Sequence, residues 1–216
     1  MQDKYQLAGN RGGAALVLDW NIMIVMHMNS KTKILGIAGS LRKDSYNRAL
    51  LRAIAGLAPD GIEIDIFELD NIPLYNQDID TQELMPESVR ELKRRIREAD
   101  AVLFVTPEYN RSIPGVLKNA IDWASRPYND NSFDDKPVAT IGATDGMLGT
   151  AVVQYHMREI FSFLNAHPME RPQLFISGIR GKLVDGKIKD EELEKLLLKF
   201  IDSLAVWAKR INKSKA

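Results

Sequence analysis

A cluster of polar side chains with one arginine and one lysine occupies residues 39–47, which read Gly-Ser-Leu-Arg-Lys-Asp-Ser-Tyr-Asn. Backbone N–H groups at a helix N-terminus carry partial positive charge, serine hydroxyls donate to phosphate oxygens, and arginine forms charge-assisted pairs with them. The run before this segment is mostly apolar, as in a buried strand, and residues 48–54 have helical spacing. The segment is therefore expected to be a strand-to-helix turn that binds a single terminal phosphate, as in a mononucleotide.

Two better-known phosphate loops are excluded by the spacing of the glycines. The chain has neither the G-x-G-x-x-G of a dinucleotide site nor the G-x-x-x-x-G-K-[ST] of a nucleoside triphosphate site at this turn. The alternative is an ordinary helix start in which Ser45 or Asn47 only caps the helix. Taken alone, this loop favours neither interpretation.

A second unusual loop covers residues 106–115, Thr-Pro-Glu-Tyr-Asn-Arg-Ser-Ile-Pro-Gly. Pro107 and Pro114 restrict its backbone at both ends, and Pro114 is compatible with the first turn of a following helix. A loop fixed in this way can offer the face of Tyr109 and backbone N–H groups near Asn110 to a planar ring. A rigid turn with Tyr109 packed on the surface is the alternative, but we favour ligand binding because the Pro-Glu-Tyr-Asn run has no evident packing purpose.

Strands and helices alternate along the chain, which predicts an α/β domain with a parallel sheet. Expected strands are 33–38, 62–66 (an edge strand), 101–105, 138–143 and 173–176, and expected helices are 48–54, 87–98, 115–124, 150–164 and 191–211. In the strand order 2-1-3-4-5, the strands that lead into loops 39–47, 107–114 and 144–150 are neighbours. Ligands bind beyond the carboxyl ends of such strands, so the three loops are expected to line one crevice.

Composition limits the classes of function. The chain has 216 residues and is 45% hydrophobic, which suits one globular domain with a substantial core. Basic and acidic residues both number 29, so the formal net charge is zero and a nucleic-acid partner is not expected. The absence of Cys excludes disulfides, thiolate metal sites and a cysteine nucleophile. His27, His156 and His167 have no metal-ligand spacing, so no metal site is expected.

The expected organisation is an N-terminal extension at 1–29, one domain at 30–212 and a tail at 213–216. Residues 14–28 are apolar but interrupted by Asp19 and Asn21, and are too short for a transmembrane helix. No small-x-small cleavage site follows them. We therefore expect a cytoplasmic protein without membrane association, whose domain begins near Met28. A surface element added to the domain is the alternative interpretation of the extension.

Residues 106–123 resemble the signature of the NADPH-dependent FMN reductase family, and its bacterial quinone and chromate reductase branch is the most similar. Residues 39–47 resemble the FMN phosphate loop of that family, and the runs at 72–76 and 154–158 also resemble the branch. The resemblance extends from about residue 33 to residue 211 and does not include the extension.

The resemblance implies a flavodoxin-like, doubly wound, five-stranded parallel sheet with helices on both faces, and FMN bound without a covalent link. The residues expected to hold the FMN phosphate are Ser40, Arg42, Ser45, Tyr46 and Asn47. Those expected to border the isoalloxazine are Pro107, Glu108, Tyr109, Asn110 and Arg111. In the third loop, Thr144, Gly146 and Gly149 are expected to contact the flavin. This loop departs from the family pattern, because Ala143 or Thr144 replaces a serine and Thr150 replaces the second glycine of a pair.

The resemblance also implies a reductase whose flavin carries the chemistry, so no catalytic side chain is expected. Hydride is expected to pass from NADPH or NADH to FMN, and electrons then to a small-molecule acceptor in a ping-pong sequence. Quinones are the expected acceptors, with azo compounds, chromate or free flavin as alternatives. Arg111 could reach the 2′-phosphate of NADPH or be a solvated loop charge. A homodimer or homotetramer is expected.

A flavodoxin-like electron carrier without its own NAD(P)H oxidation activity is the main alternative. It is disfavoured because the chain lacks a Thr/Ser-x-Thr-Gly-x-Thr type of loop and strong acidity. A phosphoacceptor receiver domain needs clustered acids after the first strand and a lysine after the last, and neither is evident. His156 and Arg158 have apolar neighbours on their helix, which favours an interface or core role over a place in the active site.

Overall fold

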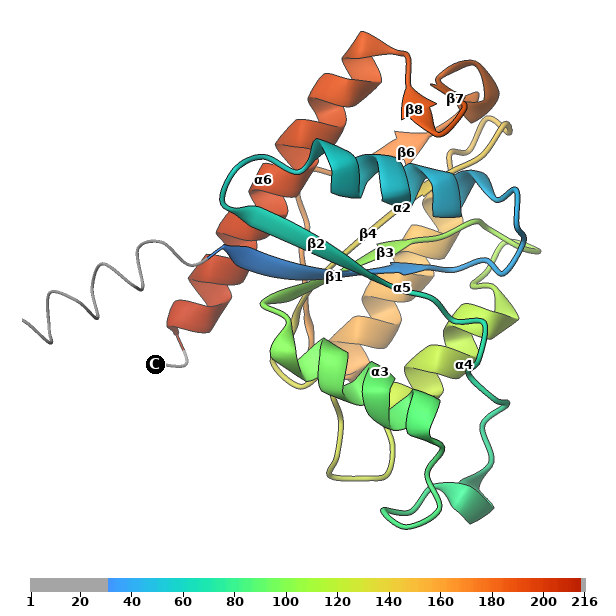
Figure 1. Ribbon diagram of the computed structural model, residues 1–216, viewed down its shortest axis with the longest axis vertical. Coiled ribbons are helices and arrows are strands. Elements are labelled where there is room, and N and C mark those ends of the chain that lie inside the picture. Colours follow the sequence, from blue (N-terminus) through green and yellow to red (C-terminus); the bar gives the residue numbers. More distant parts are fainter. Residues whose placement is uncertain (1–30, 215–216) are drawn as a thin grey trace, which may run out of the picture. The chain divides into compact units, whose positions relative to one another are not determined.

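The computed structural model describes residues 31–214, which form a parallel sheet between two layers of helices (Figure 1). The strand order is β2-β1-β3-β4-β5, and a further short strand, β6, pairs with the carboxyl end of β4. The strands are β1 (Thr32–Ala38), β2 (Ile62–Phe67), β3 (Ala101–Val105), β4 (Pro137–Ala143), β5 (His167–Pro168) and β6 (Phe175–Ile176). The predicted flavodoxin-like order is confirmed.

The central strands are apolar on both sides because helices cover both faces of the sheet. Every residue of β3 and β4 is buried. In β2, by contrast, Glu63 and Asp65 are exposed while Ile62, Ile64 and Ile66 are half-buried. This alternation suits the edge of the sheet, where β2 pairs with β1.

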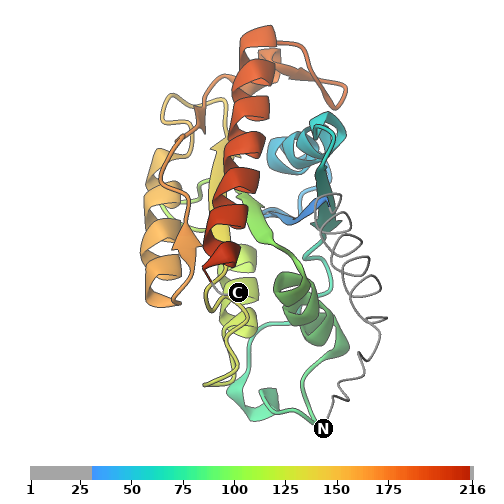
Figure 2. The ribbon, with the colours of Figure 1, turned by 90° about the vertical axis from the view of Figure 1, so that its left-hand side faces the viewer.

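Two helices pack on one face of the sheet and three on the other (Figures 1 and 2). The first face carries α2 (Tyr46–Leu57) and α6 (Glu191–Lys213), and the second carries α3 (Glu87–Glu98), α4 (Gly115–Ala124) and α5 (Ala151–Phe163). Each helix buries an apolar stripe. Leu50 and Ile54 of α2, for example, join Ile34 and Ile141 of the sheet in one core cluster. The sheet and its helices therefore hold the loops between them at fixed positions.

The last part of the sheet differs from the prediction. The sequence predicts one strand at 173–176, whereas β5 and β6 pair with opposite ends of β4. Pro172 lies between them and has no N–H for strand pairing. Short elements without a periodic pattern were also not predicted, namely η1 (Gln77–Ile79), η2 (Ile179–Gly181), β7 (Leu183–Val184) and β8 (Lys187–Ile188).

The predicted extension at 1–29 lies outside the described residues. At the other end, α6 continues to Lys213, one residue beyond the predicted end of the domain. Within residues 31–214, none of the helices combines the length and apolar character needed to cross a bilayer.

Candidate functional site

Three loops leave the carboxyl ends of β1, β3 and β4 as neighbours. Backbone hydrogen bonds join their bases: the Gly39 N–H donates to the carbonyl of Val105, and the Thr106 N–H donates to that of Ile141, each at 3.0 Å. Glycine suits this close packing, because a Cβ on residue 39 would lie 2.4 Å from Oγ1 of Thr106. The three loops that the sequence singled out therefore meet at one edge of the sheet.

The first loop carries two buried serines, Ser40 just after β1 and Ser45 at the N-terminus of α2. Ser45 is the N-cap, and its Oγ accepts from the Arg48 N–H at 3.4 Å. Oγ of Ser40 accepts from the Arg42 N–H at 3.3 Å. Each hydroxyl accepts within the chain, so its proton can donate to a ligand. The first-turn N–H groups of a helix have no internal acceptor, and Arg42 is exposed beside them. This donor set fits a phosphate group.

Asn47 is engaged differently from the prediction. Its Nδ2 donates to the carbonyl of Ala143 at 3.0 Å, and its Oδ1 accepts from the Ala143 N–H at 2.9 Å. Asn47 is only 3% exposed. Both ends of the amide thus tie α2 to the end of β4, and we assign Asn47 this structural role. Its expected contact with phosphate, for which Nδ2 keeps a second hydrogen, stays a prediction.

Tyr46, the first residue of α2, contacts two arginines. The guanidinium of Arg42 lies 5.9 Å from the centre of the Tyr46 ring, within the range of a cation–π contact. Nε of Arg180 donates to the Tyr46 hydroxyl at 3.2 Å. Tyr46 therefore orients the Arg42 side chain within the first loop, and its hydroxyl contacts Arg180, which lies far away along the chain.

The second loop is a tight hairpin turn after β3. Tyr109 and Ser112 exchange backbone hydrogen bonds of 3.1 and 2.9 Å. Between them, Asn110 and Arg111 have φ values of 51° and 62°, and positive φ at both central positions is the pattern of a type I′ turn. Tyr109 is 50% exposed, so the turn presents an aromatic ring to solvent at a fixed position.

Two side-chain contacts fasten this turn to α5. Oε2 of Glu108 accepts from the backbone N–H groups of Val152 and Val153, at 3.0 and 3.2 Å. A carboxylate is stabilised there by the positive end of the helix dipole. Oγ of Ser112 lies 3.2 Å from Nδ1 of His156. The Glu108 carboxylate therefore braces the turn against α5, and His156 supports the same turn.

The third loop ends in left-handed backbone. Gly149 has a φ of 56°, and a Cβ there would lie 2.6 Å from the carbonyl carbon of Phe175. Thr150 follows with a φ of 68°, which is rare for a β-branched residue. The buried Oγ1 of Thr150 accepts from Nε2 of Gln154 at 3.1 Å. Thr150 thus adopts a conformation that favours glycine, although the chain carries a threonine here.

Two residues outside the predicted set join the first and third loops. Asp145, in the third loop, forms an ion pair of 3.0 Å with the guanidinium of Arg180. The Tyr46 hydroxyl and then the Asp145 carboxylate raise the pKa of Arg180 above its usual range. The two neighbours of Asp145 in the chain also contact each other, because Oγ1 of Thr144 accepts from the Gly146 N–H at 3.1 Å. No sequence motif marked Arg180, because its partners lie far from it along the chain.

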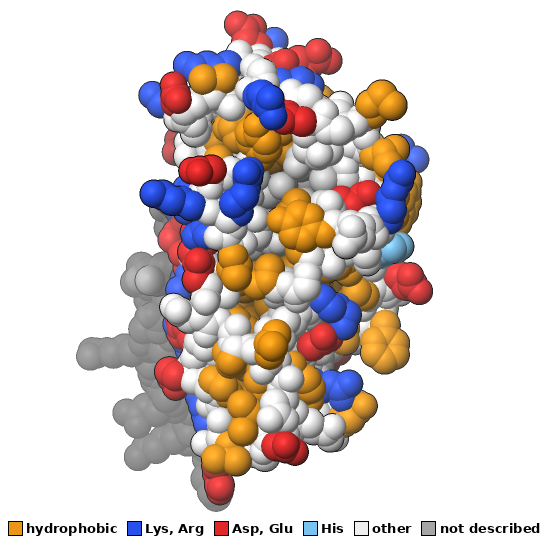
Figure 3. All heavy atoms as spheres, turned by 90° about the vertical axis from the view of Figure 1, so that its right-hand side faces the viewer, with side chains coloured by type: hydrophobic (Ala, Val, Ile, Leu, Met, Phe, Trp, Pro, Cys, Tyr) orange, Lys and Arg blue, Asp and Glu red, His pale blue; other side chains and the backbone are white. Residues whose placement is uncertain are grey.

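Figure 3 shows the molecule from the side where these loops lie, the right-hand side of Figure 1. Hydrophobic side chains are spread over this face, and basic side chains lie interspersed with acidic ones toward its upper end. The exposed apolar side chains of the three loops are Leu41, Tyr109, Met147 and Leu148. Apolar surface close to cations suits a planar ring with an anionic tail.

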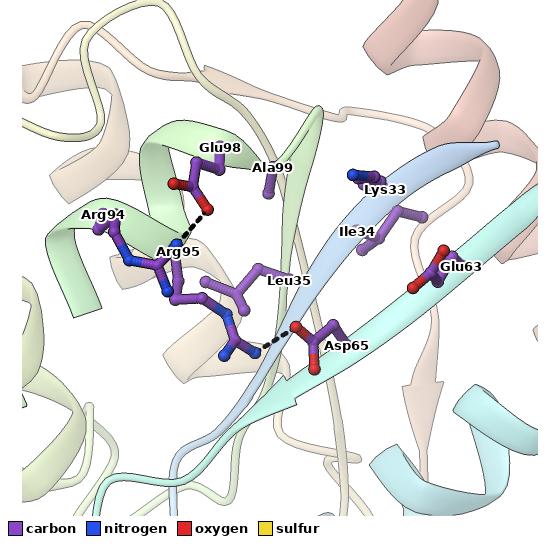
Figure 4. Close-up of a pocket in the computed structure, with 9 residues that line it drawn as sticks. All are labelled: Lys33, Ile34, Leu35, Glu63, Asp65, Arg94, Arg95, Glu98 and Ala99. Atoms are coloured by element: carbon purple, nitrogen blue, oxygen red, sulfur yellow. Dashed lines mark hydrogen bonds and ion pairs between the residues drawn. The ribbon is translucent and has the colours of Figure 1, made fainter. Parts of the chain in front are cut away.

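A separate hollow near the amino ends of β1 and β2 is lined by charged side chains from these strands and α3 (Figure 4). Its arginines are already paired, Arg94 with Glu98 and Arg95 with Asp65. We therefore assign no ligand to it. Within the described part of the chain, no group of three His, Cys, Asp or Glu side chains could hold a metal ion.

Comparison with known proteins identifies relatives that match nearly the whole described chain. The sequence model of the family described as NADPH-dependent FMN reductase matches residues 32–180, which include all three loops. An NAD(P)H-dependent FMN reductase of Pseudomonas aeruginosa is 43% identical over 185 residues, covering 85% of this chain and 99% of the relative. A 2-hydroxy-1,4-benzoquinone reductase of a Burkholderia species is 43% identical over 178 residues, covering 82% of this chain and 96% of the relative.

A solved structure agrees with these sequence matches. The flavoenzyme FerB of Paracoccus denitrificans, an NAD(P)H:(acceptor) oxidoreductase, is similar with a TM-score of 0.77 and 38% sequence identity. The match covers 83% of this chain and 98% of FerB. The similarity therefore includes the strands, the helices and the loops at the carboxyl edge of the sheet.

Proposed function

The chain belongs to the NADPH-dependent FMN reductase family, and we propose that it is an FMN-containing oxidoreductase that takes hydride from NADPH or NADH and reduces quinone-like acceptors. The observation that carries this proposal is that the loops after the neighbouring strands β1 and β3 offer two complementary binding features. The buried serines Ser40 and Ser45, in the loop that leads into the N-terminus of α2, suit a phosphate, and the fixed Tyr109 turn suits a planar ring. FMN contains both groups, whereas the names of the relatives supply the electron donor and the acceptor class.

At the phosphate end, the hydroxyls of Ser40 and Ser45 donate to phosphate oxygens beside the positive end of the α2 dipole. Arg42 adds a charge-assisted contact, and Tyr46 keeps its guanidinium near the loop. Asn47 supports this end by holding the start of α2 against β4. The phosphate contacts thus come from one short segment, whose shape is fixed by the sheet.

At the ring end, the residues proposed to border the isoalloxazine are Pro107, Tyr109, Asn110, Arg111, Thr144, Gly146 and Gly149. Glu108 acts mainly by bracing the turn against α5. When bound, FMN supplies the capacity to accept hydride and to pass on electrons. The chain fixes the orientation of the ring, donates hydrogen bonds to its edge and shields one of its faces. Donor and acceptor must then use the same remaining face in turn, which predicts ping-pong kinetics.

The cofactor can be tested on the purified protein. We expect flavin absorbance in the visible region, release of FMN on denaturation, and tighter binding of FMN than of FAD when the flavin-free protein is reconstituted. FAD has no terminal phosphate to place among the Ser40, Ser45 and Arg42 groups. Recovery of FAD, or no uptake of either flavin, would contradict the proposal.

We further propose that the protein is cytoplasmic and assembles as a homodimer or homotetramer. Exposed apolar side chains on α5 support assembly, with Tyr155 at 55% and Phe163 at 88% exposure. Leu74, in the loop after β2, is also largely exposed. Light scattering is expected to give two or four times the chain mass of 24.3 kDa. A single species of the chain mass at micromolar concentration would contradict assembly.

A further inference from the structure

The side chain of Arg180 connects two loops that are far apart in the sequence. Its Nε donates to the hydroxyl of Tyr46 at 3.2 Å, and its Nη2 lies 3.0 Å from Oδ2 of Asp145. Its backbone N–H donates to Oδ1 of the same carboxylate at 3.0 Å. One residue therefore contacts the start of α2, beside the first loop, and the third loop at the same time.

The segment that carries Arg180 is itself firmly anchored. The Ile179 N–H donates to the carbonyl of Thr144 at 3.3 Å, and the Thr144 N–H donates to that of Ile176 at 3.0 Å. The side chain of Ile179 is fully buried in the core cluster that Tyr46 also contacts. The backbone position from which the Arg180 side chain extends is thus held in place by hydrogen bonds and by the burial of Ile179.

The chemistry of arginine suits this double contact. A guanidinium is planar and presents donors on more than one edge, so it can bind a hydroxyl and a carboxylate together, whereas an ammonium is a single compact donor. Tyr46 directly follows Ser45 in the chain, and Ser45 belongs to the phosphate end. Asp145 lies between Thr144 and Gly146, which belong to the ring end.

We propose that Arg180 is a positioning residue that fixes the spacing between the phosphate end and the ring end of the flavin site. This inference rests on the proposed FMN function and adds a residue to it. A ligand that engages both ends benefits from a fixed spacing, because binding at one end then raises the effective concentration of the other end at its own site. FMN engages both ends, whereas riboflavin lacks the phosphate and engages only the ring end.

A direct attraction between Arg180 and the phosphate is the competing explanation. The Arg180 side chain is 80% exposed, so its charge is screened by solvent and salt. The two explanations predict opposite changes in FMN affinity when Asp145 is replaced. We call the contacts of Arg180 with Tyr46 and Asp145 the clasp. Removing the Asp145 carboxylate breaks the clasp and should weaken FMN binding, but it also frees the charge of Arg180 and would strengthen a direct attraction.

The experiment compares the full-length wild type with Arg180→Gln, Arg180→Lys, Asp145→Ala and Arg94→Gln, each freed of flavin. Arg94 is the matched control, because it is an exposed arginine on α3 that pairs with Glu91 and Glu98. Figure 4 shows its pair with Glu98. Replacement of Arg94 changes the net charge as Arg180→Gln does. Dissociation constants for FMN and for riboflavin are measured by flavin fluorescence, and folding is checked by circular dichroism.

We expect Arg180→Gln and Asp145→Ala to weaken FMN binding about three- to tenfold. The reason is that binding must then order the two ends, which the contacts of Arg180 hold in place in the flavin-free wild type. Riboflavin binding should change less than about twofold, so both variants lose preference for FMN. Arg180→Lys should fall between wild type and Arg180→Gln, and Arg94→Gln should match the wild type.

Three results would overturn the clasp: FMN affinity in Arg180→Gln equal to that in Arg94→Gln, equal losses for FMN and riboflavin, or tighter FMN binding by Asp145→Ala. If Arg180→Gln does not fold, Asp145→Ala and Arg180→Lys decide the question by the same criteria. A wild type that binds no flavin refutes the proposed function and the clasp with it, whereas normal wild-type binding with unaffected variants refutes the clasp alone.

Discussion

Replacing Asn47 with alanine tests whether its amide serves the fold or the phosphate. The side chain is 3% exposed and makes two hydrogen bonds with the backbone of Ala143, which is itself buried. Alanine removes both bonds and leaves a buried N–H and a buried carbonyl without their partner. Each loss of this kind costs about 1–3 kcal/mol. Alanine also favours a helix over asparagine by roughly 0.5 kcal/mol, which offsets a small part.

We therefore expect Asn47→Ala to lower the free energy of unfolding of the flavin-free protein by about 1.5–5.5 kcal/mol. Urea denaturation followed by circular dichroism measures this directly. Asn212→Ala is the matched control, since Asn212 also lies in a helix and donates one long-range amide bond, to the carbonyl of Asp100 at 3.2 Å. It is half-buried, so its loss should cost less than about 1 kcal/mol.

The use of flavin-free protein makes the result decisive. If Asn47→Ala and Asn212→Ala unfold with similar free energies while Asn47→Ala binds FMN much more weakly, the amide serves the phosphate and our structural assignment is wrong.

Three further predictions concern the loops and the domain boundary. Arg42→Ala should weaken FMN binding about ten- to a hundredfold, through loss of about 1.5–3 kcal/mol of charge-assisted contact, and an unchanged dissociation constant would move the phosphate elsewhere. Glu108→Ala should lower the free energy of unfolding by about 1–2 kcal/mol, because two N–H groups at the start of α5 lose their acceptor. An unchanged urea midpoint would show that the brace contributes nothing. A chain that starts at Met28 should fold, bind FMN and turn over, and loss of flavin binding on truncation would move the boundary toward the N-terminus.

The sheet order and the placement of the three loops could be predicted from the sequence. Buried parallel strands are continuous apolar runs, as in β3 and β4, and the edge strand β2 alternates. These patterns are local, so a single sequence reveals them. β6 is the last half of the strand predicted at 173–176, whereas β5 was not predicted. Each has only two residues, and they pair with different ends of β4. Such pairing depends on the rest of the sheet and leaves no periodic signal.

The residue types of the site could be predicted, but their individual roles could not. Serine, asparagine and glutamate at loop positions can contact a ligand or satisfy backbone groups, and the sequence pattern is the same in both cases. Asn47 and Glu108 turn out to bond to Ala143 and to α5. Arg180 was missed because its contact with Tyr46 joins residues 134 positions apart. Only the folded arrangement reveals such a contact.

The reductase function is tested most directly by anaerobic stopped flow on the FMN-loaded protein. NADPH or NADH is mixed first, and flavin absorbance should bleach. Addition of a quinone should then restore the absorbance at a rate compatible with steady-state turnover. A flavin that stays oxidised with both nucleotides, yet accepts electrons from a partner protein, would contradict the reductase and make this chain a flavodoxin-like electron carrier.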